Sequence, residues 1–163
     1  MKLEHTRAFF IFIVLLFAAP VVFAADGESQ YAKLDGTRIH YKSYGKGRDA
    51  LVLVHGWTCN LDNWRDQIPD LSKRSRVIAL DLPGHGQSDK PQITYTMDLF
   101  ANAIDAVMRD AKVERAVIAG HSMGTPVARQ FFLNVDANDA TGRIVLGCGA
   151  YASNGTCTLP NFP

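Results

Sequence analysis

The amino-acid sequence predicts an α/β fold, with a mostly parallel β-sheet, helices on both of its faces and an antiparallel hairpin at its N-terminal edge. Solid apolar runs at 50–54, 77–80, 116–119 and 144–146 show no polar alternation, as is typical of strands buried on both faces of a parallel sheet. Helical patterns separate these runs, and strands that alternate with helices indicate right-handed crossovers. Between the first two extended stretches lies an Asp-Gly turn, which indicates the hairpin.

The N-terminal segment at 1–24 has the organisation of a secretory signal peptide. Lys2 and Arg7 form a basic start, an uncharged run follows from Ala8 to Ala25, and small residues surround Ala24. We therefore expect cleavage after Ala24 and a secreted or periplasmic protein. An N-terminal membrane anchor is the alternative, since the uncharged run is just long enough to span a bilayer. Pro20 and the cleavage-like exit favour the signal peptide.

The expected mature part divides into one domain at 25–150 and an irregular tail at 151–163. The whole chain is 47% hydrophobic and 20% charged, an ordinary balance for a globular domain. Removal of the segment at 1–24 leaves basic and acidic side chains in equal number, without a basic cluster. This neutrality argues against nucleic acid as a partner. Any membrane contact would come only from an uncleaved N-terminal segment.

The first half of the domain begins with the hairpin, whose second strand covers 37–44. The strand at 50–54 follows, and then a helical pattern formed by Trp64, Ile68 and Leu71. Pro69 lies inside that pattern and must kink or split the helix. The next buried strand is 77–80.

The second half begins with a helix capped by Thr96. Its predicted buried face consists of Met97, Phe100, Ile104, Val107, Met108 and Ala111. The strand at 116–119, a helix from Met123 or Gly124 to Val135 and the strand at 144–146 complete the domain. Ligands bind outside the carboxyl ends of parallel strands, so we expect functional residues directly after Val54, Leu80 and Ala119.

A G-x-S-x-G motif, formed by residues 120–124, lies directly between the strand at 116–119 and the next helix. A sharp strand-to-helix turn lifts a serine hydroxyl clear of the sheet, and glycines on both sides avoid crowding in a strained turn. The start of the helix also offers main-chain N–H groups to an anion. We predict that Ser122 is a nucleophile and that the Met123 amide is one oxyanion donor.

A second motif, His55-Gly56-Trp57, follows the strand at 50–54. A glycine there lets the main chain turn, so that the next N–H points at a developing oxyanion. We therefore predict the Trp57 amide as the second oxyanion donor. The alternative is that His55 and Gly56 only form a tight loop.

A third motif, Asp81-Leu82-Pro83-Gly84-His85-Gly86-Gln87-Ser88-Asp89, follows the strand at 77–80. Its glycines and proline indicate a stiff loop at the same end of the sheet. Two interpretations stay open at this point. The loop forms a wall of the active site, or it is a structural turn held by hydrogen bonds of Asp81 and Ser88.

Together the three motifs, in this order and spacing, resemble those of the α/β-hydrolase superfamily over about residues 31–150. The resemblance implies a Ser122 nucleophile and acyl transfer, in a chain that stops after about the sixth strand of the fold. Serine rather than aspartate at position 122 argues against the dehalogenase and epoxide-hydrolase branches. Thr125 stands where many members of the superfamily have a further glycine, which we interpret as a subfamily difference.

The acid and the histidine of a catalytic triad are not found after Ser122. In this superfamily the chain order is serine, acid, histidine, but the sequence that follows Ser122 contains no histidine. Asp136 and Asp139 are expected at the opposite end of the sheet and are poor candidates for the acid.

None of the earlier histidines is a convincing substitute for the missing base. We expect His55, His85 and His121, together with Gly56, to support the geometry of the loops around the site rather than to transfer protons. His5 and His40 are set aside, because they belong to the signal peptide and to the hairpin.

The sequence gives no indication of a metal or another cofactor. The cysteines are Cys59, Cys148 and Cys157, and neither their number nor their spacing fits a metal site. Free or buried thiols are the simpler interpretation, although Cys148 and Cys157 are close enough in sequence to pair in an oxidising compartment.

The leading hypothesis is a serine hydrolase of small-molecule carboxylic esters or related acyl compounds, with little activity in this chain because the triad is incomplete. A non-catalytic binding protein on the same fold is the alternative from another class. A C–C hydrolase, a peptidase or a perhydrolase would be a different reaction on the same scaffold.

Overall fold

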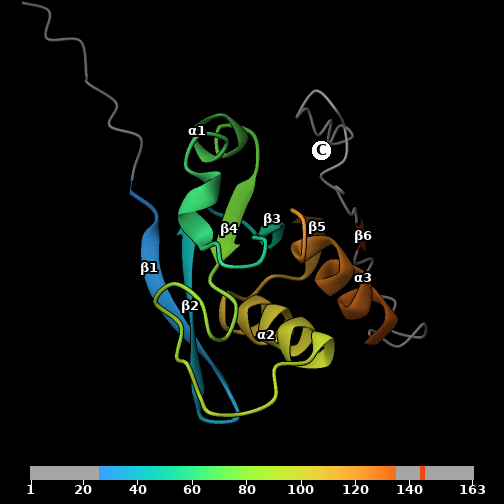
Figure 1. Ribbon diagram of the computed structural model, residues 1–163. Coiled ribbons are helices and arrows are strands. Elements are labelled where there is room, and N and C mark those ends of the chain that lie inside the picture. The colour runs from blue at the N-terminus through green and yellow to red at the C-terminus, as the bar shows by residue number, and fades with distance from the viewer. Residues whose placement is uncertain (1–25, 135–143, 146–163) are drawn as a thin grey trace, which may run out of the picture.

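Six strands form one mixed sheet in the computed structural model of the protein, which describes residues 26–134 and 144–145. Strands β4, β3, β5 and β6 are parallel, whereas β1 and β2 are antiparallel to each other and β2 is antiparallel to β4. The predicted fold class is confirmed (Figure 1). In spatial order the strands are β1 (Glu28–Leu34), β2 (Thr37–Tyr44), β4 (Arg76–Leu80), β3 (Asp49–Val54), β5 (Arg115–Gly120) and β6 (Ile144–Val145).

The predicted hairpin is present at one edge of the sheet. Asp35 and Gly36 connect β1 to β2 with φ angles of 46° and 83°, the pair of positive values that a tight two-residue hairpin turn requires. Leu34 and Thr37 face each other across this turn. β2 then pairs through Tyr41–Tyr44 with β4, so that the hairpin joins the parallel strands directly.

Strand β3 shows why the apolar runs do not alternate with polar residues. Val52 and Val54 belong to a core cluster with residues of α2 (Met97–Asp110) and α3 (Gly124–Asn134), which lie side by side (Figure 1). Leu51 and Leu53 belong to a second cluster, with residues of the short helices η1 (Leu61–Trp64) and α1 (Ile68–Leu71). Both faces of the strand are therefore covered, and each fully buried aliphatic side chain contributes about 1.5–3 kcal/mol.

The helical pattern around Pro69 is split as predicted. It forms η1 and the four-residue α1, with Pro69 in the first turn of α1, where a missing N–H costs least. Helix α2 begins after Thr96, whose hydroxyl accepts a hydrogen bond from the Leu99 N–H at 3.1 Å.

The prediction of the buried face of α2 is wrong for one residue, Met97. The side chain of Met97 is 39% exposed, because it occupies the first helical position and the buried face of α2 begins only at Phe100. Among the described helices, none is long and apolar enough to cross a membrane. The predicted signal peptide at 1–24 and the tail at 151–163 lie outside the described residues.

Candidate active site

Ser122 occupies the turn between β5 and α3 and has a left-handed main chain, with φ of 53°. For a residue other than glycine this conformation costs about 1–2 kcal/mol. A β-carbon on Gly120 would lie 2.1 Å from the Gly124 oxygen, and one on Gly124 would lie 2.3 Å from the Val54 oxygen. Only glycines therefore fit on both sides, as the sequence predicted from the strained turn.

Main-chain hydrogen bonds hold this turn in place. The His121 N–H donates to the Val54 oxygen at 2.9 Å, which ties the turn to the end of β3. The N–H groups of Gly124 and Thr125 donate to the oxygens of His121 and Ser122 at 2.8 and 3.0 Å. Ser122 remains exposed, so its hydroxyl is accessible to a substrate while its main chain is fixed.

The loop after β3 lies against this turn. A β-carbon on Gly56 would come within 3.1 Å of the β-carbon of Ser122, so a side chain at position 56 would press on the serine. The loop then turns tightly, because the Cys59 N–H donates to the Gly56 oxygen at 3.2 Å and Thr58 has φ of 59°. Position 56 therefore needs a small residue for close approach as well as for turning.

The two predicted oxyanion donors have uncommitted N–H groups. Within residues 26–134 the main-chain N–H groups of Trp57 and Met123 donate no hydrogen bond. Trp57 belongs to the turn after β3 and Met123 to the turn after β5. These two turns meet where Gly56 lies against Ser122. An oxyanion hole needs preorganised donors of this kind, so the arrangement is compatible with the predicted role, which stays a prediction.

His55 is buried, and both of its ring nitrogens have partners. Nδ1 donates to the Gly56 oxygen at 2.7 Å, and Nε2 accepts from the Leu82 N–H at 3.0 Å. Burial is the main reason that the pKa of His55 lies below its usual value, although the bond to Gly56 opposes this shift. A neutral ring with both nitrogens engaged connects the loops after β3 and β4 and has no nitrogen free to take the Ser122 proton.

His85 contacts Pro83 and Trp57, whereas His121 contacts Trp64. His85 Nδ1 donates to the Pro83 oxygen at 3.0 Å, and its ring centroid lies 5.6 Å from that of Trp57. His121 is exposed, with its ring edge-on to Trp64 at 6.4 Å. Among the described residues, no histidine is hydrogen-bonded to the Ser122 hydroxyl.

A buried polar network that sequence reasoning missed holds these loops together. His40, set aside as a hairpin residue, is fully buried, and its Nδ1 lies 2.8 Å from Asp81 Oδ2. Asp81 also accepts from the N–H groups of Leu61 at 2.7 Å and Gln87 at 2.9 Å. Sequence reasoning assigned His40 only to the hairpin, because its partner Asp81 lies 41 positions away in the sequence and comes beside it only when β2 pairs with β4.

Ser88 completes the network. Its hydroxyl donates to the Asp81 main-chain oxygen at 2.6 Å and accepts from the His40 N–H at 2.8 Å. Of the two interpretations of the loop at 81–89, the structural turn held by Asp81 and Ser88 is therefore present. The loop also contributes residues to a cavity, so the two interpretations are compatible.

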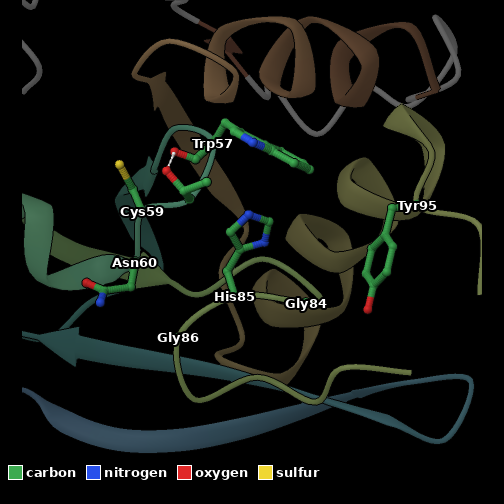
Figure 2. Close-up of a pocket in the computed structure, with 8 residues that line it drawn as sticks. Trp57, Cys59, Asn60, Gly84, His85, Gly86 and Tyr95 are labelled. Atoms are coloured by element: carbon green, nitrogen blue, oxygen red, sulfur yellow. Dashed lines mark hydrogen bonds between the residues drawn. The ribbon is translucent and has the colours of Figure 1, made fainter. Parts of the chain in front are cut away.

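A cavity of about 390 Å³ opens between the loops that follow β3 and β4 (Figure 2). Ser122 and Met123 are not among its lining residues, so the cavity lies beside the predicted nucleophile rather than on it. Trp57 is the residue that the cavity and the predicted oxyanion hole share. The lining consists of Trp57, Thr58, Cys59, Asn60, Gly84, His85, Gly86 and Tyr95.

The cysteines and the acidic residues after Ser122 are described only in part. In the described part of the chain no three His, Cys, Asp or Glu side chains gather in a way that would hold a metal ion. Cys59 is a half-buried free thiol. Cys148, Cys157, Asp136 and Asp139 lie outside the described residues.

Comparison with known proteins establishes the family. Residues 49–156 match the family model described as "alpha/beta hydrolase fold", and the chain belongs to this family. One relative is the dihydrolipoyllysine-residue acetyltransferase component of an acetoin cleaving system from Cupriavidus necator, to which the chain is 40% identical over 108 residues. This match covers 66% of the present chain and 28% of that protein.

Two solved structures show how varied the similar proteins are. Est816, described as an N-acyl homoserine lactone degrading enzyme, is 33% identical with a TM-score of 0.65 over 72% of this chain and 44% of its own. The epoxide hydrolase VrEH1 from Vigna radiata is 27% identical with a TM-score of 0.62, over 67% and 36%. The chain thus spans less than half of each of these relatives. Their different reactions mean that chemistry must be argued from the site itself.

Proposed function

We propose that this chain carries the nucleophile and the oxyanion donors of a serine hydrolase that acts on carboxylic esters or related acyl compounds. The observation that supports this most is the left-handed conformation of Ser122 on an exposed turn, with φ of 53°. Main-chain strain of this kind persists only where the surroundings impose it, and it concentrates at functional positions.

The chemistry follows from the neighbours of Ser122. Its hydroxyl would attack an acyl carbon, and the negative charge would develop on the carbonyl oxygen. The uncommitted N–H groups of Trp57 and Met123 are the donors that we assign to this oxygen, because Gly56 allows their two turns to meet at the serine. One such donor is typically worth a factor of about 100–1,000 in kcat.

Among residues 26–134, no histidine is placed to act as the base for this reaction. The histidines of the chain are at positions 5, 40, 55, 85 and 121, and the described ones have no hydrogen bond to Ser122. We propose that a histidine outside the present sequence completes the site, since the relatives extend well beyond the part that this chain matches. Serine at position 122, rather than a carboxylate, supports acyl transfer over epoxide opening.

A fluorophosphonate probe tests the proposal on the protein isolated from its native source. We expect a covalent adduct on the tryptic peptide 116–129, in which Ser122 is the only serine. The adduct should disappear in Ser122→Ala and persist in Ser72→Ala, a control at a serine outside the site. A folded native protein without labelling at Ser122 would contradict a hydrolase and favour a binding protein on this fold.

A further inference from the structure

The cavity between the loops at 57–60 and 84–86 has the size of a site for a small ring. Its volume is about 390 Å³, within the range of about 300–1,000 Å³ in which ligand pockets are found. An apolar cavity of about 150 Å³ is already large enough for benzene. The space therefore suits one or two rings rather than an extended chain.

Aromatic side chains form the walls of this cavity. The rings of Trp57, His85 and Tyr95 lie on different sides of the cavity (Figure 2), and His85 meets the indole of Trp57 edge-on at 74°. Trp57 is 61% exposed and Tyr95 is 37% exposed, so both rings have faces available. Aromatic rings prefer offset or edge-to-face partners, and this arrangement offers both kinds of contact to an inserted ring.

These walls are fixed before any ligand arrives. The Tyr95 hydroxyl donates to the Pro91 oxygen at 2.9 Å, and the ring stacks on Phe100 at 27°. The main chain of Gly84 lies directly beneath it, since a β-carbon there would come within 2.8 Å of the Tyr95 ring. His85 is held by its bond to Pro83. A preorganised site loses little entropy when it binds.

The polar character of the cavity selects a neutral ligand that can donate a hydrogen bond. None of the eight lining residues is Lys, Arg, Asp or Glu. His85 uses Nδ1 as the donor to Pro83, so in the neutral ring Nε2 is an acceptor. The described part of the chain offers this Nε2 no hydrogen-bond partner. The Lys90 ammonium group donates to the Gly86 and Ser88 oxygens at 2.8 and 3.2 Å and is not part of the lining. A carboxylate would therefore find no cation in the lining, whereas a hydroxyl would find an acceptor.

We infer that this cavity binds the aromatic alcohol that hydrolysis of the ester releases, a neutral ring of benzyl alcohol type whose O–H can donate to His85 Nε2. The inference rests on the proposed function, because it places the ring relative to a carbonyl group at Ser122. Trp57 connects the two places, since its N–H is a predicted oxyanion donor and its indole is a wall of the cavity. A substrate carbonyl at Ser122 therefore brings its substituent past Trp57 into the aromatic walls.

Trp57 fluorescence measures this binding without any chemical step. We expect benzyl alcohol to change the emission of the chain saturably, with a midpoint in the range of about 1–10 mM, as is usual for a ligand of this size. The Trp57→Phe variant supplies the background from Trp64. Cyclohexylmethanol, similar in size but not aromatic, and benzoate, aromatic but charged, should each bind at least about fivefold more weakly.

Two variants test the walls of the cavity. Tyr95→Ala should weaken benzyl alcohol binding by about fivefold or more, whereas Phe132→Ala, which removes an exposed ring of α3 outside the cavity, should leave it unchanged. His85→Phe keeps a ring but removes the acceptor, so benzyl alcohol should lose its advantage over toluene. Circular dichroism establishes that each variant is folded, and His85→Phe gives the decisive result if Tyr95→Ala does not fold.

Other outcomes would overturn the assignment. Emission that does not saturate, equal affinity for cyclohexylmethanol, or tighter binding of benzoate would each exclude a site for neutral aromatic alcohols. Ser122→Ala should bind benzyl alcohol as the wild type does. Retained binding without probe labelling would thus refute the hydrolase alone, and labelling without binding would refute the cavity assignment alone.

Discussion

Ser122 is held in an unfavourable main-chain conformation by contacts that tolerate no additional atoms. Gly120 and Gly124 face each other across the turn, and Gly124 also lies against the end of β3. The strain at Ser122 is therefore imposed by the packing of a strand, a turn and a helix. Substitution of either glycine should therefore lower the free energy of unfolding, whatever its effect on the reaction at Ser122.

Gly124→Ala tests this packing directly. A β-carbon at this position would lie 2.3 Å from the Val54 oxygen, so we expect a loss of about 3 kcal/mol in the free energy of unfolding. Gly36→Ala is the matched control, because Gly36 has φ of 83° but nothing within 4 Å of an added β-carbon. It should cost about 1 kcal/mol. Urea unfolding measures both, and equal losses would contradict the packing account.

His55 predicts a pH dependence of stability. Its pKa is lowered in the folded protein, mainly by burial, so below the usual value of 6.5 the unfolded chain binds a proton that the folded chain does not. The contribution of His55 is therefore complete above pH 6.5 and is lost as the pH falls through and below that value. We expect the urea midpoint of the wild type to fall between pH 7.5 and 5.5 by more than that of His55→Gln. Equal falls would contradict this role.

The sequence contained enough to predict a strained turn at Ser122 and a tight loop at Gly56, because each belongs to a short motif at a strand end. The roles of these residues in catalysis stay predictions. The sequence did not contain enough to place His40. That residue acts through a partner 41 positions away, and such a pairing depends on the order of the strands in space. β2 lies beside β4 only after the sheet has formed.

Asp81 connects elements rather than neighbouring residues. Its side chain accepts from η1 through Leu61, from the loop after β4 through Gln87, and contacts β2 through His40. Both walls of the cavity depend on this one carboxylate. The loops around the site are therefore positioned by a buried polar network, as buried polar groups require partners.

Asp81→Ala should destabilise the protein by about 3 kcal/mol, because it leaves two buried donors, on His40 and Leu61, and the partly buried N–H of Gln87 without an acceptor. Asp89→Ala is a suitable control in the same loop, since Asp89 pairs with Arg38 at the surface. It should cost less than about 1 kcal/mol. Thermal or urea unfolding gives the comparison, and similar losses for both variants would show that the network does not hold the loops.

Helix α2 offers a narrower test at its start. Thr96→Ala removes the hydroxyl that accepts from the Leu99 N–H, and we expect a loss of about 1 kcal/mol in unfolding free energy. Thr94→Ala, two residues earlier and exposed, should change it by less than about 0.5 kcal/mol. If the two variants have the same stability, Thr96 does not act as the cap.

Elements were more predictable than their ends. Apolar runs without alternation identified the parallel strands, since strands covered on both faces need apolar residues throughout. Pro69 predicted the split between η1 and α1. The periodic pattern placed Met97 on the buried face, but a pattern carries no information on where the partner surface stops, and α2 begins before its contact with the core.

As a whole, the molecule presents a sheet covered on both faces with the predicted site at the carboxyl ends of β3, β4 and β5. Nothing in the described residues supplies a base to Ser122. The chain spans 28% to 44% of the relatives described above. The fold was thus readable from the sequence, whereas the walls of the cavity at 57–60 and 84–86 became visible only in the structure.

The present chain alone should therefore hydrolyse p-nitrophenyl acetate poorly. A serine without its histidine loses several orders of magnitude in rate, so we expect wild type and Ser122→Ala to differ by less than about tenfold in kcat/KM. Fast hydrolysis that disappears in Ser122→Ala would contradict this expectation, because it would require a base within the present sequence.

A crystal structure of the native protein with a phosphonate bound covalently to Ser122 is the most direct test of the proposed site. The account predicts that one phosphonyl oxygen accepts hydrogen bonds from the N–H groups of both Trp57 and Met123, at about 2.7–3.1 Å. An adduct whose oxygens point away from these two amides, or a Ser122 side chain turned into the apolar interior, would contradict it.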